Sequence, residues 1–334
     1  MSAEWIITSP LDMHLHLRQD AMLRAVAPVS AQQFAGAVIM PNLVPPVTTI
    51  ERLVSYREEI LDACSDEIFE PYMTLFFRDY SGAELAAARE HIIGIKLYPE
   101  GVTTNSAGGA RDVKAFAHVF SSMQELGIPL LVHGETHGFV MDREREFMAT
   151  YQWLAETFPR LKIIMEHITT LEAVTMLDRY ENLHATITLH HLLLTLDDMA
   201  GGLLNPHLFC KPLLKRPEDR EALQQAVLTG HSKVMFGSDS APHPVSAKEC
   251  CGCAAGVFTS PVSLSMLAEF FDRHHARDKF QGFISDHARR IYGISPIAKR
   301  YTLKKDPWVV PARYESVVPL MGGTTLNWSA RPVI

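Results

Sequence analysis

His14 and His16 alternate with Leu15 in the run LDMHLHLR, near the start of this 334-residue chain. In a β-strand, residues two positions apart point to the same face, so both imidazoles would share one side of the strand. Two imidazoles on a buried face cost free energy unless hydrogen bonds or a bound ion satisfy them. A single inward histidine is usually a satisfied core residue, but a pair at a strand end, followed by Arg18, favours a metal site.

Three more residues of the ligand-forming types follow apolar runs later in the chain. His133 ends LLVHGE, His167 lies in IIMEHITT, and Asp239 lies in VMFGSDSAPH. Nitrogen and oxygen ligands of these kinds suit zinc. With His14 and His16 they make five ligands, too many for one tetrahedral ion that keeps a water. We therefore expect two metal ions that share ligands.

Lys96 lies in GIKLYP, at the end of another apolar run. An ammonium beside metal ions would be repelled by them and poorly solvated, so we expect the pKa of Lys96 to fall. The residues alone predict only an inward-facing lysine, for which a carboxylate is one possible partner.

All these candidates stand where short apolar runs end, and the runs alternate with longer segments of helical periodicity. Nearly continuous apolar runs are typical of parallel strands that are covered on both faces. The expected strands are 13–17, 37–40, 71–77, 94–98, 130–133, 162–166, 185–189 and 234–237. The clearest expected helices are 49–63, 113–126, 142–157, 171–180 and 217–228.

About eight β–α units in sequence predict an α/β fold, a (β/α)8 TIM barrel. A doubly wound open sheet would have the same periodicity, but it would spread the strand ends along one edge. A barrel brings them to a single mouth, where the chemically unusual residues can meet. We expect a single domain over residues 1–334, with residues 301–334 as a short irregular C-terminal extension packed on the barrel.

The composition excludes several classes of protein. A formal charge of −7 leaves no basic footprint, so we expect no nucleic-acid partner. We find no long uncharged apolar run and no signal-peptide pattern, and expect no membrane association and a cytoplasmic location. The five cysteines are odd in number and irregularly spaced, as in a reduced protein. The oligomeric state stays open, with a homodimer as one alternative.

Taken together, the motifs resemble those of bacterial type II dihydroorotases from about Leu11 to Gly293. The matching runs are LDMHLHLR, MPNLVPPVTT, KLYPEGVTTNS, PLLVHGE, EHITT, PHLFCKPLLKR and FGSDSAPH. The resemblance implies reversible hydrolysis of the cyclic amide (S)-dihydroorotate to N-carbamoyl-L-aspartate, the third step of de novo pyrimidine synthesis. It also implies two Zn²⁺ per subunit and a carbamate, derived from CO₂, on the lysine.

The resemblance assigns roles residue by residue. The implied ligands of one zinc are His14, His16, carboxylated Lys96 (N6-carboxylysine) and Asp239. The implied ligands of the second zinc are the same carbamate, His133 and His167. Asp239 would also be the general acid and base for a hydroxide that bridges the metals. The implied substrate contacts are His16, Arg18, Asn42, His133, Lys211, His243 and Ala255.

A loop after the lysine is expected to act as a lid. Thr103 and Thr104 of KLYPEGVTTNS match a segment that closes over the substrate in the family. Lys211 replaces a commonly apolar residue, and the CCGCAAG stretch leaves open whether Ala254 or Ala255 makes the main-chain contact.

Two other groups of ligand-type residues have less support from their spacing. Cys250, Cys251 and Cys253 lack a fourth ligand at zinc-finger spacing, so we interpret them as part of an ordinary loop. For His190 and His191, at the end of the seventh expected strand, we favour hydrogen bonding or packing at the mouth over metal ligation. Two alternative functions are a hydantoinase or dihydropyrimidinase, whose substrates lack the carboxylate, and a non-catalytic relative, which would tend to lose metal ligands.

Overall fold

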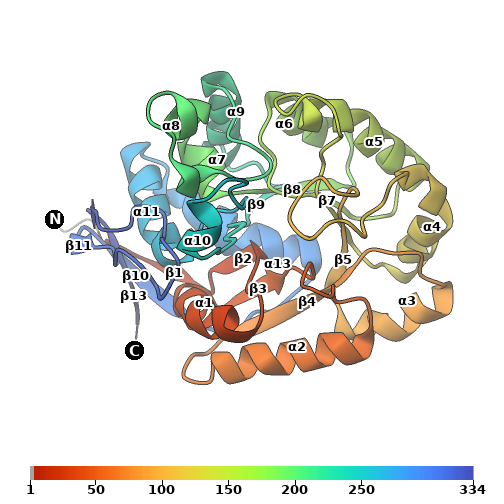
Figure 1. The fold of residues 1–334 in the computed structure, drawn as a ribbon, viewed down its shortest axis with the longest axis horizontal. Coiled ribbons are helices and arrows are strands. Elements are labelled where there is room, and N and C mark those ends of the chain that lie inside the picture. The colour runs from red at the N-terminus through yellow and green to blue at the C-terminus, as the bar shows by residue number, and fades with distance from the viewer. Residues whose placement is uncertain (1–3, 334) are drawn as a thin grey trace.

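Eight parallel strands form a barrel in the computed structural model, which describes residues 4–333 (Figure 1). The strands lie in the barrel in the order of the sequence, from β2 to β9, and each neighbouring pair is parallel. The barrel strands are β2 (Leu11–Leu15), β3 (Gly36–Ile39), β4 (Glu70–Phe76), β5 (Gly94–Leu97), β6 (Leu130–Val132), β7 (Ile163–Met165), β8 (Leu183–Ile187) and β9 (Val234–Phe236). The predicted TIM barrel is therefore confirmed.

Helices connect the strands and surround the barrel (Figure 1). The outer helices up to β9 are α1 (Asp20–Gln33), α2 (Ile50–Ala63), α3 (Gly82–Ala88), α4 (Ala117–Leu126), α5 (Arg143–Thr157), α6 (Leu171–Arg179), α7 (Leu189–Leu193), α8 (Leu196–Ala200) and α9 (Pro217–Leu228). After β9 follow α10 (Val245–Lys248), α11 (Ser263–Arg273), α12 (Arg277–Gln281), a π-helical turn (Gly282–Asp286) and α13 (His287–Tyr292).

Capping residues start or end several of these helices. The hydroxyl of Thr49 accepts from the amide of Arg52 at the start of α2, and Ser81 and Glu84 form a capping box on α3. Gly127 ends α4 at a φ of 69°, a left-handed conformation that glycine adopts without a steric penalty. Local sequence therefore determines where these helices begin and end.

The first strand departs from simple alternation. The expected strand 13–17 is β2 at Leu11–Leu15, and its register against β3 shifts between Asp12 and Leu15. Met13 packs in the interior apolar cluster with Leu11, whereas Leu15 packs in the outer core against the helices. An irregularity of this kind lets neighbouring residues face the same side, so the histidines can follow Met13 into the interior.

The seventh expected strand, 185–189, lies two residues earlier than predicted, as β8. Thr188 stops it, because its hydroxyl accepts from the amide of His191 and caps α7. His190 and His191 therefore lie in the first turn of a short helix, not at the end of a strand.

The C-terminal segment is more regular than expected. Its β10 (Arg300–Lys304) pairs antiparallel with β1 (Glu4–Thr8) and with β13 (Ser329–Pro332), and β11 (Trp308–Val309) pairs with β12 (Thr325–Leu326). These strands lie beside both described ends of the chain, on one side of the barrel (Figure 1). The sequence concealed this sheet because each strand is short and its partner is distant along the chain.

The interior of the barrel is divided into two layers. The amino-terminal half is apolar, with Met13, Val38, Leu131, Ile164 and Met235 packed on Ala288 and Ile291 of α13. The side chains above this layer, toward the carboxyl ends of the strands, are polar. No helix among the described residues is long and apolar enough to cross a membrane.

Candidate active site at the barrel mouth

The six residues expected to hold metal all lie at the carboxyl ends of barrel strands. They come from β2, β5, β6, β7 and β9 or from the residues directly after them, and all are buried: His14, His16, Lys96, His133, His167 and Asp239. Parallel strands of a barrel end at one mouth, so residues separated by up to 225 positions in the sequence converge there.

One part of this layer brings His14, His16 and Asp239 together. His16 Nε2 lies 3.0 Å from Asp239 Oδ1, and His14 Nε2 lies 3.5 Å from the same oxygen. The two Nε2 atoms are 3.3 Å apart. The three side chains offer ligand atoms close enough together for one metal ion.

The proton on His14 is directed away from this group. Its Nδ1 donates to Glu166 Oε2 at 2.6 Å, and that oxygen also accepts from the Thr186 hydroxyl at 2.7 Å. Burial lowers the pKa of His14 to about 4. With Nδ1 protonated in a neutral ring, Nε2 presents a lone pair toward the Asp239 carboxylate, and two such acceptors repel each other unless a cation lies between them.

His133 and His167 form the second part of the layer. His133 Nε2 donates to Glu135 Oε2 at 2.8 Å, which leaves Nδ1 as a lone pair, 3.1 Å from His167 Nε2. This is again the carboxylate–histidine arrangement that orients metal-binding imidazoles.

Lys96 lies at the base of both parts and is fully buried. Its Nζ has no hydrogen-bond partner among the described residues, and it lies 5.2 Å from the centre of the Tyr98 ring. Burial lowers the pKa of Lys96 to about 8, which increases the fraction of neutral amine. An unpartnered buried amine fits a group that is modified or bound to metal better than a structural ion pair.

The backbone at the site is strained. Arg18, His167 and Asp239 have φ angles of 58°, 42° and 44°, in the left-handed region that side chains other than glycine seldom occupy. Such conformations persist where surrounding contacts enforce them, and they cluster at functional sites. Here Asp239 is held because its amide donates to the carbonyl of His14 at 2.9 Å.

The loop that carries His167 is held from the outer helix. Glu144 of α5 is buried, and its two carboxylate oxygens each lie 2.9 Å from the amide of Thr169. It also accepts from the amide of Thr170 at 3.3 Å. This bond pattern explains the two threonines of the EHITT motif, because they orient the backbone directly after the histidine.

The expected substrate residues form the wall beside the metal layer. Arg18 Nη2 lies 3.1 Å from His243 Nε2, and Arg18 Nε donates to the carbonyl of Pro242 at 3.1 Å. His243 Nε2 in turn lies 3.0 Å from the carbonyl oxygen of Ala255. A guanidinium on one side of a buried pocket is suited to bind a ligand carboxylate.

The loop that contains Thr103 and Thr104, the expected lid, lies closed against this wall. Asn42 Nδ2 donates to the carbonyl of Thr104 at 3.0 Å, and Lys211 Nζ donates to the carbonyl of Val102 at 2.9 Å. Only about 20 Å³ of free space remains beneath, about the room that one water needs. The loop must therefore move to admit a cyclic amide.

The cavity gathers eleven of the predicted site residues, together with three that the sequence analysis missed. Lys96 and His243 do not line the free space themselves; Lys96 lies beneath the site and His243 behind Arg18. The missed residues are Tyr98, Ala241 and Gly256. Tyr98 lies two positions after Lys96, so strand alternation would have placed it on the same inward face.

A (β/α)8 barrel with this buried layer at its mouth defines the class of metal-dependent hydrolases. The amidohydrolase family matches residues 6–292, and the chain belongs to this family, within its dihydroorotase branch, whose members hydrolyse cyclic amides.

The relatives cover nearly the whole length of the chain. A dihydroorotase from Helicobacter hepaticus is 46% identical over 332 residues, with 96% of each chain covered. The crystal structure of a dihydroorotase from Campylobacter jejuni has 52% identity and a TM-score of 0.95, covering 99% of this chain and 98% of that one. The dihydroorotase from Saccharomyces cerevisiae, solved with 5-fluoroorotic acid, has 34% identity and a TM-score of 0.91, with 98% of both chains covered.

Proposed function

We propose that this protein is a zinc-dependent dihydroorotase of pyrimidine biosynthesis, which interconverts (S)-dihydroorotate and N-carbamoyl-L-aspartate. The observation that carries the proposal is the combination of the converging ligand atoms of the metal layer with Arg18 on the adjacent wall. Relatives of 46% and 52% identity that are named dihydroorotases support it. The ligand in the yeast structure, 5-fluoroorotic acid, is by its name a carboxylic acid, as an arginine in this position would suit.

The residues present fit two metal ions. His14, His16 and Asp239 would hold one, His133 and His167 the other, and a carbamate on Lys96 would be shared by both. The fit rests on the lone pairs of His14 and His133 that face other ligand atoms, and on the unpartnered Lys96 Nζ. Bound zinc supplies Lewis acidity and a water of lowered pKa.

The side chains of the chain itself account for orientation and proton transfer. Arg18, Asn42 and His243 would anchor the substrate carboxylate and turn the ring amide toward the metal layer. Asp239, at the edge of that layer, would hold a proton on its carboxylate and deliver it to the amide nitrogen that leaves. The closed loop with Thr103 and Thr104 would exclude bulk water while the ring opens.

The proposal is tested by assaying the purified protein on L-dihydroorotate, hydantoin and dihydrouracil, with metal content measured on the same sample. We expect hydrolysis of dihydroorotate alone and at least two zinc equivalents per chain. Faster turnover of the rings without a carboxylate would instead indicate a hydantoinase or dihydropyrimidinase. No turnover of any of the three rings by a protein loaded with metal would indicate a non-catalytic relative.

A further inference from the structure

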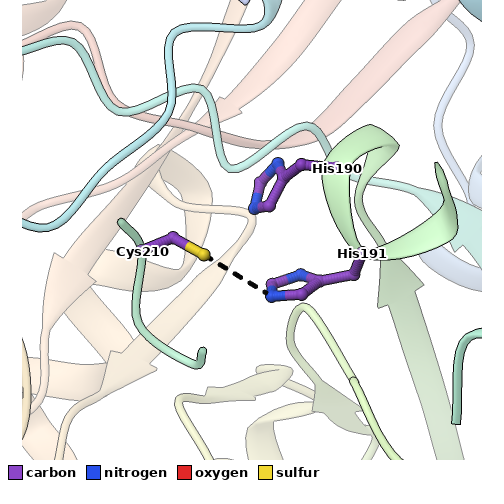
Figure 2. A group of neighbouring side chains, drawn as sticks. All are labelled: His190, His191 and Cys210. Atoms are coloured by element: carbon purple, nitrogen blue, oxygen red, sulfur yellow. Dashed lines mark hydrogen bonds between the residues drawn. The ribbon is translucent and has the colours of Figure 1, made fainter. Parts of the chain in front are cut away.

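A second cluster of ligand-type side chains lies outside the metal layer. His190 and His191 occupy the first turn of α7, and Cys210 lies on the segment that follows the 3₁₀ turn Pro206–Leu208. All three are buried, and their candidate ligand atoms lie within 4.8 Å of one another. Figure 2 shows the two imidazoles and the thiol facing a common space.

His190 is the unusual member of this cluster. It is fully buried, yet neither of its ring nitrogens has a hydrogen-bond partner among the described residues. Buried polar groups in folded proteins are nearly always satisfied, because leaving one unpaired costs free energy. The ring therefore lacks a partner that would compensate for its burial.

His191 has a tautomer that leaves a lone pair for such a partner. Its Nδ1 lies 2.8 Å from the Thr188 hydroxyl oxygen, which can accept a hydrogen bond from Nδ1–H. Its Nε2 lies 3.0 Å from the carbonyl oxygen of Pro212 and 3.8 Å from Cys210 Sγ. In the tautomer protonated at Nε2, the ring donates a hydrogen bond to the Pro212 carbonyl. In the tautomer protonated at Nδ1, Nε2 carries a lone pair that can bind an ion.

The spacing of sulfur and nitrogen fits a zinc-type ion. Zn–S and Zn–N bonds at a tetrahedral angle place the two ligand atoms about 3.6 Å apart. The observed separation of 3.8 Å between Cys210 Sγ and His191 Nε2 is close to that value. Imidazole and thiolate are also the ligands that select zinc over magnesium or calcium.

We propose that His190, His191 and Cys210 form a third metal site, which takes a thiophilic divalent ion of the Zn²⁺ class and shares no residue with the metal layer at the mouth. On binding, the Cys210 thiol releases its proton to solvent and the thiolate offsets one of the two charges of the ion. The nearby Lys248 ammonium is held by the carbonyl oxygens of Phe209, Ala254 and Gly256, at 2.8–3.0 Å.

The role of this ion would be to hold the substrate wall in place. Cys210 directly precedes Lys211, which lines the cavity and bonds to the lid at Val102. An ion bound at the cluster would join α7 to this part of the wall. An ion that binds only the folded chain also stabilises it by mass action.

The test uses Co²⁺ as a spectroscopic probe of the metal-free protein. Only a cysteine-containing site gives an intense thiolate-to-cobalt charge-transfer band in the near ultraviolet, and the mouth layer holds no cysteine. We expect this band in the wild type and in the control Cys253→Ser, and its loss in Cys210→Ser. Cys253 is a suitable control because it is half-buried and its thiol contacts the carbonyl of Pro206, outside the cluster.

Three further measurements keep the result interpretable. Zinc content should fall by one equivalent in Cys210→Ser relative to the wild type. His190→Gln, which keeps the thiol, should weaken Co²⁺ binding at this site by more than about tenfold. Circular dichroism verifies that each variant folds. A wild type without the band, or a Cys210→Ser protein with unchanged band and zinc content, would overturn the proposal. Because no readout uses turnover, the result is independent of the dihydroorotase assay.

Discussion

The same eight strands form an apolar layer at one end of the barrel and a polar layer at the other. At the amino-terminal end, Met13, Leu131, Ile164 and Met235 meet α13 in a dry apolar layer. At the carboxyl-terminal end the same strands continue into histidines, a lysine and carboxylates that are buried with unpartnered atoms and left-handed backbone. Stability is concentrated at one end and chemistry at the other.

Cavity size alone would have suggested the wrong end. A groove of about 740 Å³ opens at the amino-terminal end, beside Tyr72, Lys162 and Tyr292, whereas only about 20 Å³ is free in the closed site beneath the loop at the mouth. None of the clusters of metal-ligand side chains among the described residues lines the groove, whereas one of them lines the closed site. The comparison teaches that converging chemistry locates a closed site better than empty volume does.

We expect the largest loss of turnover from a substitution of Lys96. Lys96→Ala removes the group that both metals would share, so turnover should fall on the order of 10³-fold or more, and at least one metal equivalent should be lost. Steady-state kinetics and metal analysis measure both. Lys162→Ala, a matched lysine at the other end, should keep both metals and full turnover. Two metals and near-normal turnover in Lys96→Ala would exclude the carbamate, whereas partial rescue by a small carboxylic acid would support it.

Arg18 separates substrate binding from metal binding within the mouth. Arg18→Met should weaken dihydroorotate binding by roughly 2–5 kcal/mol, as for truncation of one partner of a buried charge pair. The metal content should stay at the wild-type value. Unchanged kinetics toward dihydroorotate would shift the preferred substrate toward an uncharged cyclic amide.

The opposite end should respond in stability alone. Ile164→Ala creates a cavity in the apolar layer, so the free energy of unfolding should fall by about 2–5 kcal/mol. Denaturant titration measures this change. Metal content and the kcat of the folded fraction should not change, and loss of metal in this variant would show that the two layers are coupled.

The lid is predicted to act on turnover without affecting the metals. Replacing Thr103 by Ala and Thr104 by Gly together should lower kcat on the order of 100-fold, which is the loss of rate expected when a substrate is misplaced by about 1 Å. Both zinc ions should stay bound. Wild-type kcat in this variant, or equal protection of the loop from proteolysis with and without ligand, would refute the lid.

The smallest effect is expected from the support behind His167. Glu144→Gln replaces one carboxylate oxygen that accepts from the loop after His167, which should lower the free energy of unfolding by about 1–2 kcal/mol. It should also weaken metal binding by about 10- to 100-fold. Glu146→Gln, on the exposed side of the same helix, is the control. Equal metal affinity in the two variants would show that Glu144 only stabilises the fold.

The sequence by itself determined the barrel and the residue types at its mouth. Alternating strand and helix periods are local properties, and parallel strands in a closed barrel leave only one place for their carboxyl ends to meet. The positions of Lys96, His133, His167 and Asp239 at strand ends could therefore be predicted, as could the start of the helix expected at 49–63.

Only the tertiary structure decided what depends on contacts between distant segments. The irregularity between Asp12 and Leu15 lets Met13 and the histidines share the interior, and alternation along one strand cannot reveal it. β10 pairs with β1, nearly 300 residues earlier in the chain, so the sequence of the extension alone does not reveal that it forms a strand. Likewise, His190 and Cys210 are 20 positions apart, and only the turn of α7 brings them to one buried space, because burial and side-chain direction are set by packing and not by spacing.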